Sequence, residues 1–161
     1  MYGNWIRDKI YTTQEFPLGA KVEDQDGRVF KFVKYYAGTD VVVGVAGRLA
    51  IALDSAYEDN AVTMDYSGAG LTAIPAKPEG FLQAAFTDLT FGWVQTFGDN
   101  MESMLTDGSV AQGERLMKHA TTDGGIDTHD DTSAIVVAVA KEADTGTALT
   151  AGQAKILLET V

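Results

Sequence analysis

Short stretches in which apolar and polar residues alternate run along most of the chain, separated by glycine and acidic residues. Residues 21–23 and 28–36 alternate in this way on either side of a turn that contains Asp26-Gly27. An Asp-Gly pair favours the positive φ of tight hairpin turns, and the β-branched and aromatic residues that follow favour a strand. The two segments are therefore predicted to form a β-hairpin, with Lys31 and Lys34 on a half-exposed strand.

Seven further apolar stretches are short and interrupted by glycine or polar residues, which favours strands over helices. They are residues 41–45, 49–53, 62–66, 80–86, 91–98, 134–140 and 154–158. The stretch 134–140 is the most hydrophobic of them, and we expect it to be a central strand. In total, about ten strands at intervals of roughly 8 to 12 residues predict a mostly β fold, either an antiparallel β-sandwich or a barrel.

Residues 99–107 are compatible with two structures. A short helix could start at Asp99 or Asn100 and stop at Gly108. The alternative, a strand that leads into the turn at Asp107-Gly108, is slightly favoured.

Aromatic residues are concentrated on one predicted strand face. Phe91, Trp93 and Phe97 are spaced two residues or a multiple of two apart, so they share one face of the strand 91–98. Three aromatic rings on one face belong to the core or, if that face points outward, to a contact between subunits.

Residues 1–18 are rich in aromatic and apolar side chains but show neither strand alternation nor helical periodicity. We interpret them as an extended N-terminal arm, followed by a single β-rich domain over residues 19–161. Such an arm buries its rings either on its own domain or on a neighbouring subunit, and both alternatives remain open. The candidates for contact with a partner are Tyr2, Trp5, Ile6, Ile10, Tyr11 and Phe16.

The charge of the chain is strongly negative and unevenly distributed. Its 12 basic and 23 acidic residues give a formal net charge of -11, which argues against direct binding of nucleic acid because phosphate binding needs clustered Lys and Arg. Residues 1–48 carry 7 of the basic and 6 of the acidic residues, so the negative charge resides in residues 49–161. The near-neutral first third is thus suited to contact with a partner, and the acidic remainder is suited to exposure to solvent. An acidic surface, however, commonly serves solubility alone.

The 161 residues contain no cysteine, which excludes disulfides, thiolate metal sites and a cysteine nucleophile. With 45% hydrophobic and 22% charged residues, the composition is that of one ordinary folded domain. The first ten residues lack the hydrophobic run of a signal peptide, and no stretch approaches about 18 apolar residues. We therefore expect a protein made in the cytoplasm that contacts no membrane.

One dense polar segment, residues 123–131 together with His119, could bind a divalent cation or activate water. The residues that a metal-assisted hydrolase would use are His119, Asp127, His129 and Asp131. Metal sites require ligands held by rigid elements, whereas this segment is predicted to be a glycine-rich loop without a helical ligand pair. Neither histidine lies near a nucleophile-elbow pattern. We therefore expect no enzymatic activity and no cofactor, and interpret the His129-Asp130-Asp131 segment as a solvated loop.

The sequence Phe91-Gly92-Trp93-Val94-Gln95, followed by Val110-Ala111, Gly113 and Leu116, resembles a pattern of small β-rich head decoration, or cement, proteins of tailed bacteriophages. The likeness extends over residues 80–160 and omits the N-terminal arm. Glu114-Arg115 and the loop 129–131 depart from the pattern.

The resemblance implies a homotrimer that binds the outer surface of a phage head and clamps neighbouring major capsid protein subunits. Under that reading, Phe91, Trp93 and Phe97 belong to the core or the trimer contact. The aromatic and apolar residues of the arm would anchor the protein on the capsid. The alternatives are another trimeric virion component, such as a fibre or tail adaptor, and, with less support, the hydrolase.

Overall fold

The computed structural model describes residues 5–53, 57–66, 77–106, 108–129, 135–144 and 148–158. Within these ranges all regular secondary structure is β-strand, so the predicted mostly β class is confirmed. The strands are β1 (Lys21–Glu23), β2 (Val29–Tyr35), β3 (Leu49–Ala52), β4 (Ala61–Thr63), β5 (Pro78–Leu82), β6 (Phe91–Asp99), β7 (Met104–Leu105), β8 (Arg115–Lys118), β9 (Ile126–Thr128), β10 (Ala138–Ala140), β11 (Ala148–Leu149) and β12 (Ala154–Leu157).

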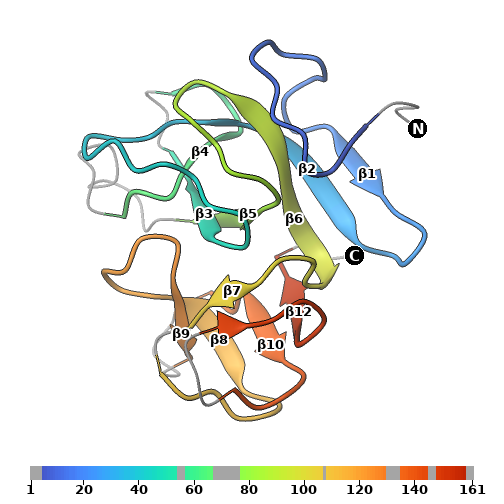
Figure 1. Ribbon diagram of the computed structural model, residues 1–161, viewed down its shortest axis with the longest axis vertical. Helices are drawn as coiled ribbons and strands as arrows, with labels where there is room; N and C mark the ends of the chain where they lie inside the picture. Colours follow the sequence, from blue (N-terminus) through green and yellow to red (C-terminus); the bar gives the residue numbers. More distant parts are fainter. Residues whose placement is uncertain are drawn as a thin grey trace.

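Five strands close into a barrel. They follow the order β2-β4-β3-β5-β6, and pairing of β6 with β2 completes the circle (Figure 1). The β2–β4 pair is parallel, while the other four pairs of the barrel are antiparallel. Alternate residues of each strand fill the interior, among them Val33, Tyr35, Val62, Leu82 and Val94. Of the two architectures predicted, this half is therefore a barrel.

The predicted hairpin over residues 21–36 is confirmed. β1 and β2 pair antiparallel in a register that sets Lys21 opposite Lys31 and Val22 opposite Phe30. Asp24 holds the turn, because its Oδ1 accepts hydrogen bonds from the backbone N–H groups of Asp26 and Arg28. The turn thus fixes the register of the pair and, with it, the positions of Lys21 and Lys31.

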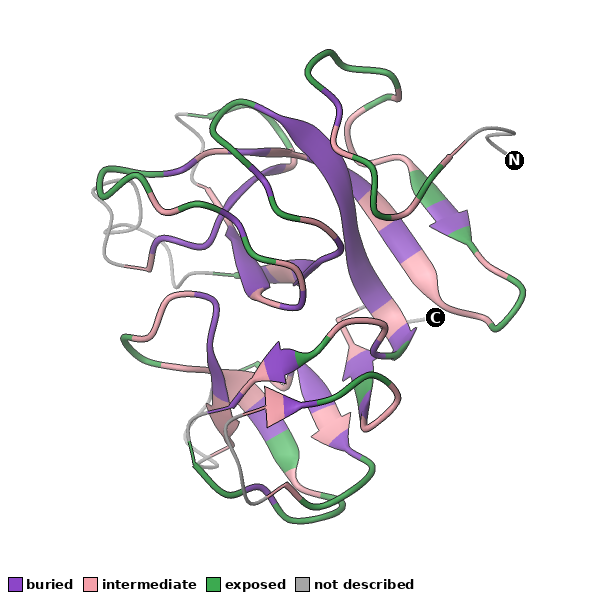
Figure 2. Ribbon diagram, in the orientation of Figure 1, coloured by how far each residue is buried: buried purple, intermediate pink, exposed green. Residues whose placement is uncertain are grey.

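The long strand β6 joins the barrel to the C-terminal half of the chain. Its last residues pair with β12, and the sheet continues through β10 and β8 to β9, below the barrel in Figure 1. Figure 2 shows β6 buried along most of its length. A second core lies under this extension, and it includes Leu49 of β3 and Phe81 of β5 together with Leu116, Ile126 and Ile156. The two halves therefore share a hydrophobic core.

Residues 5–18 lie against the outer face of β2 and β6. That face carries the outer aromatic cluster, which consists of Tyr11, Val22, Phe30, Phe32, Phe91 and Trp93. Trp5, Phe16 and Leu18 pack against it, and Tyr11 exchanges two backbone hydrogen bonds with Phe91. Of the two locations left open for the aromatic N-terminal residues, the described segment thus occupies its own barrel.

The strand predicted at residues 41–45 is wrong. These residues, here called the valine loop, leave β2 through Gly38 and Val41, whose φ angles are +75° and +54°. Val41, Val43 and Val45 are 70%, 53% and 45% exposed. The positive φ of Val41 interrupts the extended backbone that a strand needs. The intervening residues face the barrel: Val42 packs on the interior cluster, and Gly44 exchanges backbone hydrogen bonds with Phe86.

Three other predicted segments differ in extent. The central strand expected at 134–140 is reduced to β10, which does lie between two strands, β12 and β8. Residue 134 lies outside the described residues. The strand alternative for residues 99–107 is confirmed in the short strand β7. The strand predicted at 62–66 is β4, one residue earlier at its start and shorter at its end.

Candidate functional site

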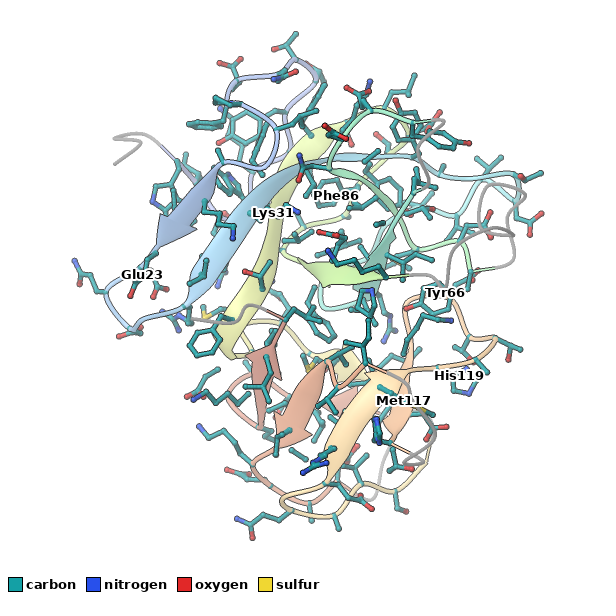
Figure 3. All side chains as sticks on the ribbon, turned by 180° about the vertical axis from the view of Figure 1, so that it is seen from behind. Glu23, Lys31, Tyr66, Phe86, Met117 and His119 are labelled. Atoms are coloured by element: carbon teal, nitrogen blue, oxygen red, sulfur yellow. The ribbon has the colours of Figure 1, made fainter. Side chains whose placement is uncertain are left out.

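A groove of about 190 Å³ opens at the end of the barrel where β2 and β5 begin and β6 ends. Its lining includes Lys21, Lys31, Lys77, Glu79, Thr96 and Leu158, and these residues define the barrel-end groove. Figure 3 shows this side of the molecule, with Lys31 on β2 and Glu23 at the end of β1. The groove brings three ammonium groups together in a chain whose formal net charge is -11.

Strand alternation places two of the lysines. Phe30 and Phe32 point from β2 into the outer aromatic cluster, so Lys31 points to the opposite face, as Val33 does further along the strand. Lys21 stands directly opposite Lys31 in the β1–β2 register. Because directly opposed residues of an antiparallel pair share a face, Lys21 and Lys31 both point to the groove side.

A β-bulge places Glu79. The β3–β5 register sets Ala50 opposite Gly80 but Ile51 opposite Pro78, so Glu79 is the extra residue. A bulge re-aims the side chain of the residue that it contains. The position after it must be glycine, because a Cβ on Gly80 would lie 2.7 Å from Val94 Cγ2 in the barrel interior.

The Glu79 carboxylate links two of the three lysines. Lys31 Nζ donates a hydrogen bond of 2.6 Å to Glu79 Oε2, and both side chains are largely shielded, at 16% and 11% exposure. Lys77 Nζ lies 3.3 Å from Glu79 Oε1 and is 67% exposed. Among the described residues that line the groove, Glu79 is thus an acidic group placed beside the basic groups of Lys31 and Lys77.

This chemistry suits binding of an anion. Ammonium groups offer several donors each and attract carboxylate or phosphate oxygens. The described lining residues include no histidine or serine beside Glu79 and present no nucleophile–base pair, and Thr96 Oγ1 donates to the backbone oxygen of Val29. The groove is therefore a polar hollow in which lysine side chains and one glutamate lie close together.

The polar loop singled out in the sequence has a different geometry. His119 Nδ1 accepts hydrogen bonds from the backbone N–H groups of Thr121 and Thr122, at 3.1 and 2.8 Å. Asp127 Oδ1 accepts one from Thr128, and Asp123 Oδ1 accepts one of 2.8 Å from the backbone of Tyr66. His119 and Asp127 thus accept from backbone groups close to them in the sequence, as turn-forming side chains do, whereas Asp123 binds a backbone group of the barrel half.

Of the four hydrolase candidates, the described residues include His119, Asp127 and His129, which do not form a metal-binding cluster. In the described part of the chain, no group of three or more His, Asp or Glu side chains is placed to hold a metal ion. His129 extends the ladder of β9, since its backbone N–H donates to the oxygen of Arg115. Asp130 and Asp131 lie outside the described residues.

Tyr66, labelled in Figure 3, and Lys118 connect this loop to the barrel. The Tyr66 hydroxyl donates to the backbone oxygen of Leu49 at 3.1 Å, and burial raises the pKa of this hydroxyl. Lys118 Nζ lies 4.1 Å above the Tyr66 ring and donates to the oxygen of His119, and burial lowers the pKa of Lys118. Tyr66 and Lys118 therefore link the C-terminal half of the chain to the barrel.

The predicted contact residues of the N-terminal segment are mostly occupied within the chain. Trp5, Tyr11 and Phe16 pack on the outer aromatic cluster, and Ile10 packs on the barrel interior. Ile6 is 51% exposed, and Tyr2 lies outside the described residues. Among the trimer or core candidates, Phe91 and Trp93 are buried in the outer aromatic cluster, whereas Phe97 is half-buried with Lys155 Nζ 5.2 Å from its ring centre.

No family model matches this chain, and no curated protein matches it. The resemblance of residues 91–116 to head decoration proteins stays a prediction. The described residues include no helix of the length and hydrophobicity that a membrane crossing requires.

Proposed function

We propose that the protein is a non-enzymatic head decoration protein that binds the outer surface of a phage capsid and stabilises contacts between major capsid protein subunits. The observation that carries the proposal is the motif layout of residues 91–95 and 110–116. The partners that follow from it are the major capsid protein and further copies of the chain in a homotrimer.

The motif residues have a structural role that agrees with a rigid scaffold. The first part lies in β6, the strand that pairs with β2, β5 and β12 and so connects the two halves of the chain. In the second part, Val110 exchanges backbone hydrogen bonds with Asp144, and the N–H of Gly113 donates to Ala140. Leu116 is fully buried in the second core. A scaffold of this kind holds its surface loops in fixed positions, as a clamp requires.

The valine loop supports a role in protein binding. It presents three exposed valines, although its backbone is held by Tyr35, whose hydroxyl donates to the oxygen of Val42 at 2.7 Å. A β-branched residue with positive φ, as at Val41, is strained, and such strain persists where the surrounding structure holds it. Apolar side chains that are already held in place lose less entropy on binding a partner.

Co-sedimentation with phage heads that lack the protein tests the proposal. The wild-type chain is expected to sediment with these heads and to have, in solution, the mass of a trimer of the 17.2-kDa chain. Replacing Val41, Val43 and Val45 together by serine should weaken binding, while Ile135→Ser, at an exposed residue of the C-terminal half, should not.

Two results would overturn the proposal. One is wild-type protein that stays in the supernatant with intact heads. The other is antibody labelling of virions that is confined to the tail, which would assign the protein to a fibre or a tail adaptor.

A further inference from the structure

Two apolar residues of neighbouring loops have a left-handed backbone conformation. Val41 has a φ of +54° and Leu89 a φ of +59°, and in the described part of the chain Asn60 is the one other non-glycine residue with a positive φ. Asparagine tolerates this conformation, whereas a β-branched or bulky side chain is strained in it. Glycine would relieve the strain at either position, so valine and leucine there cost stability.

Backbone hydrogen bonds join the two loops at the end of the barrel where β2 ends and β6 begins (Figure 1). The N–H of Leu89 donates to the oxygen of Tyr35 at 2.9 Å, and the N–H of Val42 donates to the oxygen of Ala37 at 2.7 Å. Between the loops, the N–H of Ala37 donates to Asp88 Oδ1 at 2.9 Å. The positions of both loops are therefore fixed relative to each other.

The strained side chains are exposed to solvent. Val41, Val43 and Leu89 are 70%, 53% and 52% exposed, and these three residues define the strained-loop surface. Strain of this kind persists where the surrounding structure holds it, and it is concentrated at sites of function. Because these side chains lie largely outside the core, packing within the chain does not explain the strain, and the combination points to binding.

The carboxylate of Asp88 sets the charge beside Leu89. Asp88 is exposed, and the backbone group that it binds does not neutralise its charge. Residues 36–47 and 83–90, which form the two loops, contain no Lys or Arg. Two copies of this surface would bring like charges together, and an anionic lipid surface would be repelled. The occupant that fits is an apolar protein segment that carries a basic residue.

We propose that the strained-loop surface binds an apolar side chain of a partner protein that has a lysine or arginine beside it, with the basic group pairing with Asp88. Because the loops are already held in place, their side chains lose little entropy on binding. The inference deepens the proposed function and rests on it only for the identity of the partner, the major capsid protein.

Glycine substitutions test the strain itself. Val41→Gly and Leu89→Gly each relieve a left-handed conformation, so both variants should match or exceed the wild type in the urea midpoint of unfolding. Val43→Gly is the matched control from the same loop. Val43 is not among the described residues with positive φ, so this variant gains only freedom in the unfolded state and should have a lower midpoint. A midpoint of Val41→Gly as low as that of Val43→Gly would overturn the inference.

Binding is tested on the isotope-labelled full chain by NMR titration with blocked hexapeptides of alternating Leu and Lys, Leu and Glu, or Ser and Lys. We expect the leucine–lysine peptide to shift the amide resonances of Val41, Val43 and Leu89, and the other two peptides to bind at least about tenfold more weakly. Val43→Gly and Leu89→Gly should each raise the Kd for the leucine–lysine peptide by about tenfold, since each removes apolar area from the contact.

Asp88→Asn tests the charge while keeping the oxygen that accepts from Ala37. This variant should raise the Kd for the leucine–lysine peptide by about threefold and weaken its dependence on salt. Glu142→Gln, at an exposed residue of the C-terminal half, is the control and should leave Kd unchanged.

Three results of the titrations would overturn the inference. The first is a leucine–lysine peptide that binds neither the wild type nor this surface, or binds the glycine variants as tightly as the wild type. The second is equally tight binding of the leucine–glutamate peptide. The third is self-association of the wild type that Leu89→Gly abolishes, without any peptide binding, because the surface would then be a contact between subunits.

The same variants separate this inference from the proposed function. If wild-type protein binds heads and both Leu89→Gly and Asp88→Asn bind them equally well, the docking role of this surface fails and the decoration role stands. If the leucine–lysine peptide binds through this surface but the wild type binds no heads, the docking role stands and the decoration role fails.

Discussion

Trp5 packs edge-on against Trp93, with ring centroids 5.5 Å apart and ring planes inclined by 66°. Trp93 is fully buried in β6, whereas Trp5 precedes all the strands and has no regular secondary structure. Trp5 also contacts Phe30, at a centroid distance of 5.3 Å. The N-terminal segment is thus a cover over the outer aromatic cluster.

Replacing Trp5 by alanine should destabilise the fold. A fully buried Trp or Phe costs about 3–5 kcal/mol on truncation, and Trp5 is only partly buried, so we expect a loss of about 2 kcal/mol in the free energy of unfolding. Urea denaturation followed by the fluorescence of the remaining tryptophan, Trp93, measures it. Ile6→Ala is the matched control, since Ile6 is 51% exposed and should change stability by less than about 0.5 kcal/mol. Equal stability of the two variants would contradict packing of the segment in solution.

Deletion of residues 1–15 is a poor test of a docking role for the N-terminal segment. Such a deletion removes Trp5 and Tyr11 and uncovers Phe32 and Trp93, so it weakens the barrel itself. Loss of head binding by this variant would therefore not by itself assign a docking role to the segment. Point substitution at exposed Ile6 is the cleaner probe of a capsid contact.

The sequence predicted those parts of the fold whose conformation depends on residues that are close together in the chain. The hairpin was predictable because aspartate and glycine are residue types that favour the turn conformations adopted by Asp24 and Gly27. The valine loop was not, because an apolar stretch indicates burial but cannot show that alternate valines face solvent. Its backbone depends on Phe86, more than forty positions away, which only the closed barrel brings to Gly44.

The barrel-end groove was beyond sequence reasoning for a related reason. Opposition of Lys21 and Lys31 follows from the hairpin register and could have been found. Glu79 could not, since its position depends on a bulge in β5 and on two strand pairs that join β5 to β2 through β6. The candidate catalytic loop was recognised by residue type alone, and residue type does not distinguish a ligand from a turn acceptor such as His119.

Close packing around Gly92 of β6 predicts the result of a small substitution. A Cβ on Gly92 would lie 2.5 Å from Phe86 Cζ, and Phe86 is fully buried in the barrel interior. Gly92→Ala should therefore destabilise the protein by about 1–3 kcal/mol through overpacking. In the double variant with Phe86→Leu, the smaller side chain makes room, so the two effects should combine to less than their sum. Strict additivity in chemical denaturation would show that Gly92 and Phe86 are not in contact.

Tyr35 should make stability depend on alkaline pH. Burial raises the pKa of its hydroxyl from 10.0 to about 12, because the charged form is poorly solvated in the barrel. A folded-state pKa above the unfolded value gives a stabilising contribution that is complete below pH 10 and is lost as pH rises through about 12. The free energy of unfolding of the wild type relative to Tyr35→Phe should decline over that interval. A difference that stays constant would mean that the hydroxyl is not buried.

Asp24 should make stability depend on acid pH in the opposite sense. Although its partial burial acts to raise its pKa, hydrogen bonds from Arg28 and Asp26 outweigh burial and hold the pKa below the usual 3.8. A lowered folded-state pKa gives a stabilising contribution that is present above the unfolded value and is lost as pH falls through the folded one.

Asp24→Asn isolates this effect. The variant keeps one side-chain oxygen but loses the charge that Arg28 Nε contacts at 2.6 Å, so it should be less stable than wild type by about 1 kcal/mol at neutral pH. The two proteins should converge as pH falls below 3.8, where the wild-type carboxylate becomes protonated. Asp59→Asn, at an exposed residue, is the control and should follow the wild type throughout. If the wild type kept its full advantage over Asp24→Asn at the lowest pH, the hairpin turn would owe its stability to the shape of Asp24 and not to its charge.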